Sequence, residues 1–312
     1  STPCIFTSPT GKPELIFKGS SIQLTEGPHL YKRNGYYYLL TAEGGTEYEH
    51  AVTLARSREL RGPYEVHPEN PILTSLGNPD LALQKAGHAS LVETPSGEWY
   101  MPHLCGRPIP GTRRCNLGRE TAIQKVEWRE DDWLYLSCGG NEPQAEVPAP
   151  DLEPHSFPEL PSRLPFDSPH YATPRGPSSS VVRKPNRLTL EGKESLESNF
   201  EQAMLARRLT SQRSTVTTKL SFEPESFQQM AGLAAYYNTY LFHYLYLSMD
   251  EDKGLCLQIH SCDDGVSSFP LGSGIIPVST GELFLRATFE DKDLQFHFSE
   301  DGENFRKAGP VL

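Results

Sequence analysis

The feature that most constrains the fold of this sequence is a hairpin signal that recurs along its first half. Residues 29–42, HLYKRNGYYYLLTA, place two apolar and aromatic runs around Asn34-Gly35, a dipeptide that strongly favours a tight β-hairpin. The plan recurs in ASLVETPSGEWYMPHL (89–104) and in TAIQKVEWREDDWLYLS (121–137). Short strands joined by turns therefore predict an all-β structure in this part of the chain.

The repeated units share a second pattern, because each opens on a glycine beside a polar residue. The pairs are Glu26-Gly27, Gly87-His88 and Gly118-Arg119. Repeated antiparallel units are typical of the blades of a β-propeller, in which the first strand of every blade lines the central channel. We therefore expect Glu26, His88 and Arg119 to meet in one pocket on the propeller axis.

The composition of the sequence divides the chain into three parts. With 312 residues, two domains are expected at about 150 residues each. Residues 1–138 form the propeller part, and residues 139–185, dense in Pro, Ser and acidic residues, are predicted to be a linker or extended arm. Strand patterns return over 186–312 and predict an antiparallel β-sandwich.

Charge and cysteine usage narrow the classes of partner. The net charge of −11 argues against nucleic acid, and no apolar run approaches the length of a membrane span. The opening STPCIFTSPTGKPELIF lacks the pattern of a signal peptide, there is no glycosylation sequon, and the six cysteines show no CxxC spacing. These features favour a cytoplasmic, reducing location. A bridge between Cys105 and Cys115 across their loop stays open.

Several long motifs carry a resemblance to a known family. They are TEGPHLYKRNGYYYLLTAEGGTEYEHAVTLARS, LQKAGHASLV, GRPI, LGRETAIQKVEW and AGLAAYYNT. Together they resemble the β-xylosidases of glycoside hydrolase family 43, of the type with a five-bladed propeller followed by a concanavalin-like sandwich. The resemblance covers nearly the whole chain except the region around 139–180.

The resemblance implies hydrolysis with inversion, in which one carboxylic acid protonates the leaving oxygen and a second carboxylate activates water. Glu26 of TEGPH falls on the general acid. Arg119 of LGRETAIQK falls on an arginine that contacts the terminal sugar, His88 of KAGHAS on an axial histidine, and Thr46 of EGGT on a residue that meets a sugar hydroxyl. No cofactor is implied as a requirement, although relatives place Ca²⁺ or a water cluster at the histidine.

Each assignment has a simpler structural alternative. Glu26 could be a solvated end of a hairpin, and Arg119 could form a surface ion pair with Glu120 or Glu127. His88 could be a hydrogen-bonded core residue, and one imidazole alone makes a weak calcium site because Ca²⁺ prefers oxygen ligands. The other acids of the hairpin loop, Glu43, Glu47 and Glu49, are expected to be rim residues or hairpin supports. The tyrosines at 36–38 and 236–237 are expected to be half-buried strand residues and not sugar platforms.

The resemblance also leaves a gap. The family's base and its acid-modulating residue are aspartates upstream of the acid, whereas no Asp precedes Glu26 and the first one, Asp80, matches neither role. A five-bladed ring needs about 200–250 residues, so we expect N-terminal blades and the end of the sandwich to be missing from this chain.

The expected function is exo-hydrolysis of β-1,4-xylosidic bonds from the non-reducing end of xylo-oligosaccharides, with α-L-arabinofuranosides as further substrates. The expected partners are xylo-oligosaccharides or xylose, the missing segments of the same enzyme, and further copies of the chain in a homo-oligomer. Two alternatives stay open: a non-catalytic carbohydrate-binding fragment, and an enzyme that is mainly an arabinofuranosidase.

Overall fold

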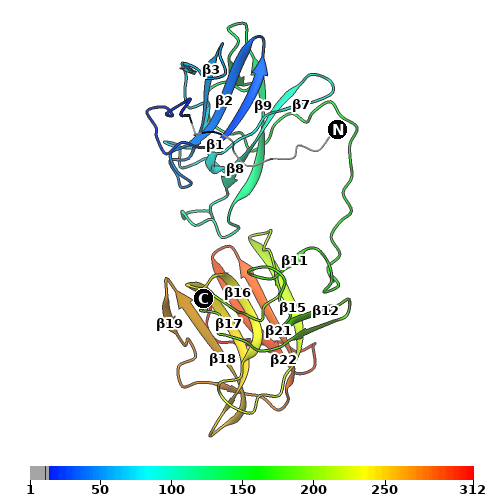
Figure 1. The fold of residues 1–312 in the computed structure, drawn as a ribbon. Helices are drawn as coiled ribbons and strands as arrows, with labels where there is room; N and C mark the ends of the chain where they lie inside the picture. The colour runs from blue at the N-terminus through cyan, green and yellow to red at the C-terminus, as the bar shows by residue number, and fades with distance from the viewer. Residues whose placement is uncertain (1–10, 12–13) are drawn as a thin grey trace. The chain divides into compact units, whose positions relative to one another are not determined.

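The computed structural model describes residue 11 and residues 14–312, and it separates into two compact units, 1–156 (unit 1) and 157–312 (unit 2) (Figure 1). Residues 1–10 and 12–13, with Cys4 and most of the stretch considered for a signal peptide, lie outside the described residues. All regular elements of the described chain are strands, β1 to β23, as the all-β prediction requires. A helix able to span a membrane is not found among these residues.

The first sheet of unit 1 is an antiparallel meander. It contains β1 (Glu26–Arg33), β2 (Tyr36–Glu43), β3 (Ala51–Ser57) and β4 (Glu65–Val66), in that order, with β5 (Leu73–Thr74) beside β3. Arg33 pairs with Tyr36, so the β1–β2 turn has only two residues. Asn34 and Gly35 have φ of 47° and 76°, as the predicted tight turn requires. The Asn34-Gly35 hairpin is confirmed.

The second sheet of unit 1 has the same plan. It contains β6 (Gln84–Gly87), β8 (Trp99–Gly106), β9 (Glu120–Trp128) and β10 (Leu134–Leu136), with the short β7 (Val92–Glu93) beside β8. The unit that opens at Gly118 was expected to begin a further blade, and this was wrong. Its strand β9 pairs with β8 from Trp99↔Val126 to Cys105↔Glu120, so it is the third strand of the second sheet.

The two sheets enclose one apolar core. Tyr38, Leu40, Leu54, Met101 and Leu134 are among its fully buried members. Residues of this core come from both sheets, which is the arrangement expected of neighbouring propeller blades.

Tyr38 belongs to that core, Tyr36 packs against it, and Tyr37 is half-buried, so the three tyrosines are buried or half-buried strand residues, as predicted. The Tyr38 ring lies 4.6 Å from that of Trp128, and its hydroxyl donates to the carbonyl of Asp132. These rings are therefore held by packing and are not exposed as a sugar platform.

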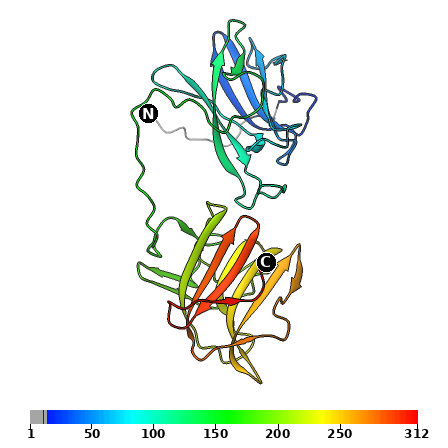
Figure 2. The ribbon, with the colours of Figure 1, turned by 180° about the vertical axis from the view of Figure 1, so that it is seen from behind.

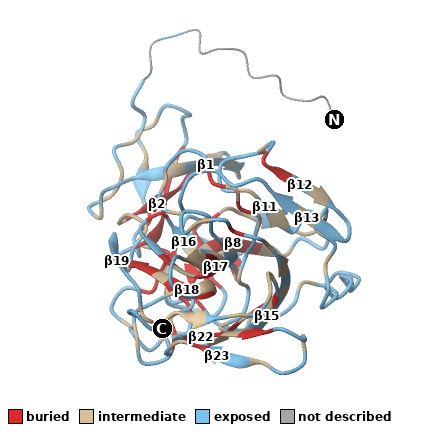
Figure 3. Cartoon of the chain, turned by 90° about the horizontal axis from the view of Figure 1, so that it is seen from below, coloured by how far each residue is buried: buried red, intermediate tan, exposed pale blue. Residues whose placement is uncertain are grey.

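Unit 2 is a β-sandwich (Figure 2). One sheet contains β15 (Arg213–Ser221), β21 (Glu282–Glu290), β22 (Asp293–Ser299) and β23 (Arg306–Ala308); the other contains β16 (Ala231–Asn238), β17 (Leu241–Asp250), β18 (Gly254–Asp263) and β19 (Val266–Ser268), with β20 (Ile276–Pro277) beside β18. The inner faces of the two sheets share a single core, whose members include Leu245, Leu257, Leu285 and Phe296. Buried residues accordingly follow β17 and β18 (Figure 3).

The segment predicted as a linker contains the boundary between the units. Residues 139–170 form no strand. The end of the segment holds β11 (Tyr171–Ala172) and β12 (Val181–Lys184), which pair inside unit 2 with β14 (Ala206–Arg207) and β13 (Arg187–Leu190).

The cysteine question has a clear answer in the structure. Cys105 and Cys115 are both free thiols. Burial raises the pKa of the Cys105 thiol to about 11, which keeps it protonated and unreactive at neutral pH.

Candidate active site

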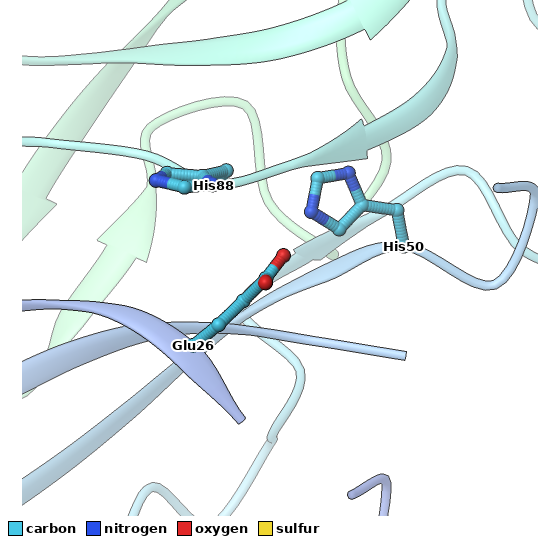
Figure 4. Close-up of side chains that lie close together, drawn as sticks. All are labelled: Glu26, His50 and His88. Atoms are coloured by element: carbon cyan, nitrogen blue, oxygen red, sulfur yellow. The ribbon is translucent and has the colours of Figure 1, made fainter. Parts of the chain in front are cut away.

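Three side chains from separate elements of unit 1 converge at one end of its sheets. Glu26 is the first residue of β1, His50 immediately precedes β3, and His88 immediately follows β6. One carboxylate oxygen and one nitrogen of each imidazole lie within 4.8 Å of one another. Figure 4 shows the three side chains pointing toward one another. The predicted approach of Glu26 and His88 is therefore present, and His50 joins them.

Two glycines make this approach sterically feasible. A Cβ on Gly27 would lie 2.5 Å from Nε2 of His88, and a Cβ on Gly87 would lie 2.4 Å from Cγ of His50. Both distances are shorter than packed atoms tolerate. Gly27 also has φ of +54°, a region that glycine adopts at no steric cost. The glycines noted in the sequence therefore leave room for the neighbouring imidazoles.

The backbone is irregular at the same place. His88 has φ of +50°, which is uncommon for a residue with a side chain and carries a conformational cost that functional sites often retain. The β1–β2 register shifts between Glu26 and His29, and the β6–β8 register shifts between Gln84 and Gly87. Bulges of this kind redirect side chains at the ends of strands, and here they lie next to the group of three.

His50 is the most enclosed member of the group. Its side chain is fully buried, and its Nδ1 lies 3.2 Å from the carbonyl of Lys85. The carbonyl can only accept, so Nδ1 carries the proton and Nε2 presents a lone pair. Nε2 is buried without a hydrogen-bond partner among the described residues.

Burial is also the main reason why the pKa of His50 is lowered, so its imidazole is neutral at pH 7. The charge of His88 and that of Arg119 lower the pKa of His50 further, whereas Glu26 and the Lys85 carbonyl raise it. Arg119 therefore lies close enough to act electrostatically on the group.

Arg119 is exposed and stands just before β9. The two carboxylates considered as its surface partners are bound by other arginines. Glu120 accepts hydrogen bonds from Arg107 at 2.8–3.2 Å, and Glu127 accepts one from Arg129 at 3.0 Å. The ion pairs of Glu120 and Glu127 with other arginines do not exclude a contact with Arg119. Its electrostatic effect on the pKa of His50 is consistent with the predicted meeting with the site, which stays a prediction, whereas the assignment of its unit to a further blade was wrong.

Thr46 lies in the loop between β2 and β3, four residues before His50, and is half-buried. Asp80 is exposed in the loop between β5 and β6, where its backbone N–H donates to Asn78 Oδ1 at 3.3 Å.

The segment that leads into Glu26 is anchored by Glu43. This carboxylate is fully buried at the end of β2. It accepts hydrogen bonds from the backbone and hydroxyl of Ser20 and, at 2.9 Å, from the hydroxyl of Thr25. A buried carboxylate with three donors is well compensated. Glu43 is therefore a hairpin support, as predicted, and it fixes the residue before Glu26.

Glu47 and Glu49 complete the set of acids predicted as rim or support residues. Both are exposed in the loop between β2 and β3. Glu47 forms an ion pair with Lys85 at 2.6 Å.

The sequence patterns missed His50. It stands in EHAVTLA before a buried apolar strand, which is typical of a core residue and carries no local signal of function. The available signal was Gly87, because a glycine at a strand end indicates a close approach by another group.

The arrangement offers specific chemistry. An accessible carboxyl group can transfer a proton, a neutral imidazole beside it can accept a hydrogen bond or bind a metal, and a guanidinium can bind hydroxyls or carboxylates. Two imidazoles and one carboxylate are a poor match for the Ca²⁺ expected at His88, since Ca²⁺ takes six to eight oxygen ligands.

Comparisons with known proteins agree with this arrangement. Residues 6–134 match the family model of Glycosyl hydrolases family 43, and residues 163–312 match the model of the Beta xylosidase C-terminal Concanavalin A-like domain. The candidate active site lies within the first match.

Individual relatives are similar over most of this chain. The chain is 45% identical to Xylosidase/arabinosidase 43B of Humicola insolens and 45% identical to Beta-xylosidase of Bacillus subtilis (strain 168), in both cases over 97% of the chain. It superimposes on the crystal structure of xylan beta-1,4-xylosidase from Bacillus halodurans C-125 with a TM-score of 0.91 and 50% identity over 95% of the chain. It spans 58–60% of the length of these proteins.

Proposed function

The chain belongs to glycoside hydrolase family 43, and on that premise we propose that it takes part in inverting exo-hydrolysis of β-1,4-xylosidic bonds. The substrates are xylo-oligosaccharides cleaved from the non-reducing end, with α-L-arabinofuranosides as second substrates. The observation that carries the proposal is the convergence of Glu26 with His50 and His88 in the part of the chain that matches the family. The names of the relatives at 45% identity support the same substrate class.

In this proposal Glu26 is the general acid. Its carboxyl proton moves to the glycosidic oxygen as the bond to the anomeric carbon breaks. Arg119 binds hydroxyls of the terminal xylose and holds negative charge near the reacting centre, because a guanidinium offers several donors at once. His88 lies against the same sugar, and Thr46 meets one of its hydroxyls.

The base that activates water is the remaining requirement. The group of three contains one carboxylate, that of Glu26, and the two carboxyl groups of an inverting site are about 6.5–9.5 Å apart, so the base is not a member of this group. Inversion needs that second carboxylate on the opposite face of the sugar. We propose that it comes from another segment of the same enzyme or from a second copy of the chain.

The test uses azide to replace the base. Azide is already an anion, so it can attack the anomeric carbon without general-base help while Glu26 protonates the leaving oxygen. The chain is incubated with xylobiose and azide, and formation of α-xylosyl azide and xylose is measured. Glu26→Gln should lower this rate by about 10²–10⁴-fold. Glu49→Gln, which changes an exposed acid of the β2–β3 loop, is the matched control and should leave the rate unchanged.

Other outcomes would contradict the proposal in different ways. Xylobiose binding without azide-dependent turnover would favour a carbohydrate-binding fragment. Turnover that survives in Glu26→Gln would refute the acid assignment. A much larger kcat/KM for p-nitrophenyl α-L-arabinofuranoside than for p-nitrophenyl β-D-xyloside would make the chain mainly an arabinofuranosidase.

A further inference from the structure

Unit 2 contains a cavity that the proposed function does not use. Its volume is about 490 Å³, which lies within the range of small-molecule binding sites. The residues that line it lie in three segments: 172–175 at β11, 199–206 up to β14, and 236–240 at the end of β16 and in its turn into β17. Side chains that are far apart in the sequence therefore surround one space.

Two tyrosines line this cavity and are largely exposed. Tyr237 is 66% and Tyr240 is 57% exposed. The β16–β17 register shifts between Tyr236 and Asn238, and a bulge of this kind redirects the side chain next to it. Tyr240 is fixed through its backbone, whose N–H donates to Asn238 Oδ1 at 2.8 Å and whose carbonyl accepts from the Gly265 N–H at 2.9 Å. The strand end thus presents two aromatic side chains that packing of the core does not require.

A buried glutamine joins the three segments behind the cavity. Gln202 is 6% exposed. Its amide nitrogen donates to the carbonyls of Leu196 and Ser198 at 2.7 and 2.8 Å and lies 3.2 Å from the hydroxyl of Tyr236. Its amide oxygen accepts from Arg175 Nη1 at 3.3 Å. One side chain therefore connects all three walls, and a cavity held in this way needs little ordering when a ligand binds.

The polar groups of the cavity are mostly neutral. Thr239 is buried, and its hydroxyl donates to Asn199 Oδ1 at 3.3 Å. This contact occupies the oxygen of Asn199 and leaves its amide nitrogen as a donor. Among the described lining residues, Arg175 is the one with a charged side chain. Amide, hydroxyl and phenol groups with a single guanidinium suit a neutral ligand that is rich in hydroxyl groups.

A saccharide combines the two properties that this cavity can recognise. The faces of a pyranose ring present C–H groups, which pack against the negative face of an aromatic ring. Its edge carries hydroxyl groups, which both donate and accept hydrogen bonds. Xylopyranose has no exocyclic hydroxymethyl group, so its faces are open to aromatic side chains.

We propose that the cavity of Tyr237, Tyr240, Asn199 and Arg175 is a second saccharide site, which binds xylo-oligosaccharides without cleaving them. The choice of xylose as the sugar rests on the proposed function, whereas the saccharide class rests on the cavity itself. A ligand held there stays attached to the protein between hydrolytic events, which raises the effective concentration of its remaining chain ends.

The experiment is a calorimetric titration of xylohexaose into the complete chain carrying Glu26→Gln, so that the sugar is not consumed. Binding should persist when Arg119→Ala is added. Tyr237→Ala and Tyr240→Ala should each weaken it by about 10-fold or more, as expected when an aromatic anchor of a binding site is removed. Phe227→Ala is the matched control, because it removes a ring of unit 2 that is 56% exposed and lies outside the cavity.

The outcomes separate this proposal from its alternatives. Xylohexaose binding that disappears in Arg119→Ala and is unchanged in both tyrosine variants would place the sugar in unit 1 and refute the second site. An equal loss in Phe227→Ala would show that exposed rings of unit 2 bind the sugar without a defined site, and absence of any binding would also overturn the proposal. Both tyrosines are exposed, so their removal opens no core. The titration needs no turnover, so failure of the proposed hydrolysis leaves this test intact.

Discussion

Acidification should destabilise unit 1 through His103, a buried histidine of its second sheet. His103 lies on β8 and is 2% exposed. Its Nδ1 lies 3.0 Å from the Leu104 carbonyl, and its Nε2 lies 3.2 Å from Nε2 of Gln124. The neutral ring satisfies both contacts, donating to the carbonyl and accepting from the amide. A second ring proton would face the amide hydrogens of Gln124, so the folded state resists protonation.

The magnitude follows from the pKa. Burial is the main cause that lowers the pKa of His103 from 6.5 to about 4. The hydrogen bond to the Leu104 carbonyl raises this pKa, and the charge of His50 lowers it. The unfolded chain therefore binds more protons than the folded one between these values, and the stability that this group contributes is present above pH 6.5 and is lost as the pH falls toward 4. At 1.36 kcal/mol for each pKa unit, full protonation of His103 lowers the free energy of unfolding by roughly 3 kcal/mol. About 2 kcal/mol of this is lost between neutral pH and pH 5. The total free energy of unfolding of a typical domain is about 5–15 kcal/mol, so this loss is a large part of it.

The assay is urea unfolding followed by tryptophan fluorescence at pH 7.5 and pH 5. All three tryptophans, at 99, 128 and 133, lie in unit 1, so the signal reports that unit. His103→Gln should be less stable than the wild type at pH 7.5, and the difference should shrink by about 2 kcal/mol at pH 5. His260→Gln, in unit 2, controls for the exchange of a histidine elsewhere. Parallel pH dependence in the wild type and in His103→Gln would refute the argument.

Three further predictions concern the supports of the site and the segment between the units. Gly87→Ala should destabilise unit 1 by about 1–3 kcal/mol, because its Cβ would overlap the ring of His50, and urea unfolding measures this. Glu43→Ala should cost a similar amount, about 1–3 kcal/mol in the same assay, because Ser20 and Thr25 lose a buried acceptor. Brief trypsin digestion should cut first at Arg163, which is exposed and is the first Lys or Arg after residue 129, and mass spectrometry of the fragments identifies the cut.

Each of these three has a result that would count against it. Wild-type stability of Gly87→Ala would mean that the His50 ring is free to shift. Full stability of Glu43→Ala would mean that the segment before Glu26 is held by other contacts. A first tryptic cut inside a strand of either unit would mean that the strand-free segment is protected.

The parts of the fold that depend on local chemistry could be predicted from the sequence. Asn34-Gly35 specifies its turn through backbone conformations that few dipeptides adopt, so the β1–β2 hairpin follows from two residues. The order of strands across a sheet is not local. The unit at Gly118 looked like a new blade, yet β9 pairs along β8, because a sheet adds strands according to side-chain packing that no short window contains.

The candidate site was predictable in part for the same reason. Glu26, His88 and Arg119 stand in long motifs that resemble a family, and the first two do meet. His50 stands in the first of these motifs too, but no role was assigned to it, because only the pairing of distant strands brings its ring beside Gly87. Tyr237 is a second error of this kind: expected to be half-buried, it is 66% exposed, because the β16–β17 register shifts next to it, between Tyr236 and Asn238.

The close contact of Gly87 with His50 has an evolutionary consequence. Neither residue can change size alone, because a methyl group at position 87 needs the volume that the imidazole fills. In a library that randomises both positions, alanine at 87 should survive selection for folding mainly beside a small residue at 50. The two positions are 37 apart in the sequence and should change together during evolution. A smaller residue at 50 would make a larger residue at 87 tolerable, although the change at 87 alone is destabilising.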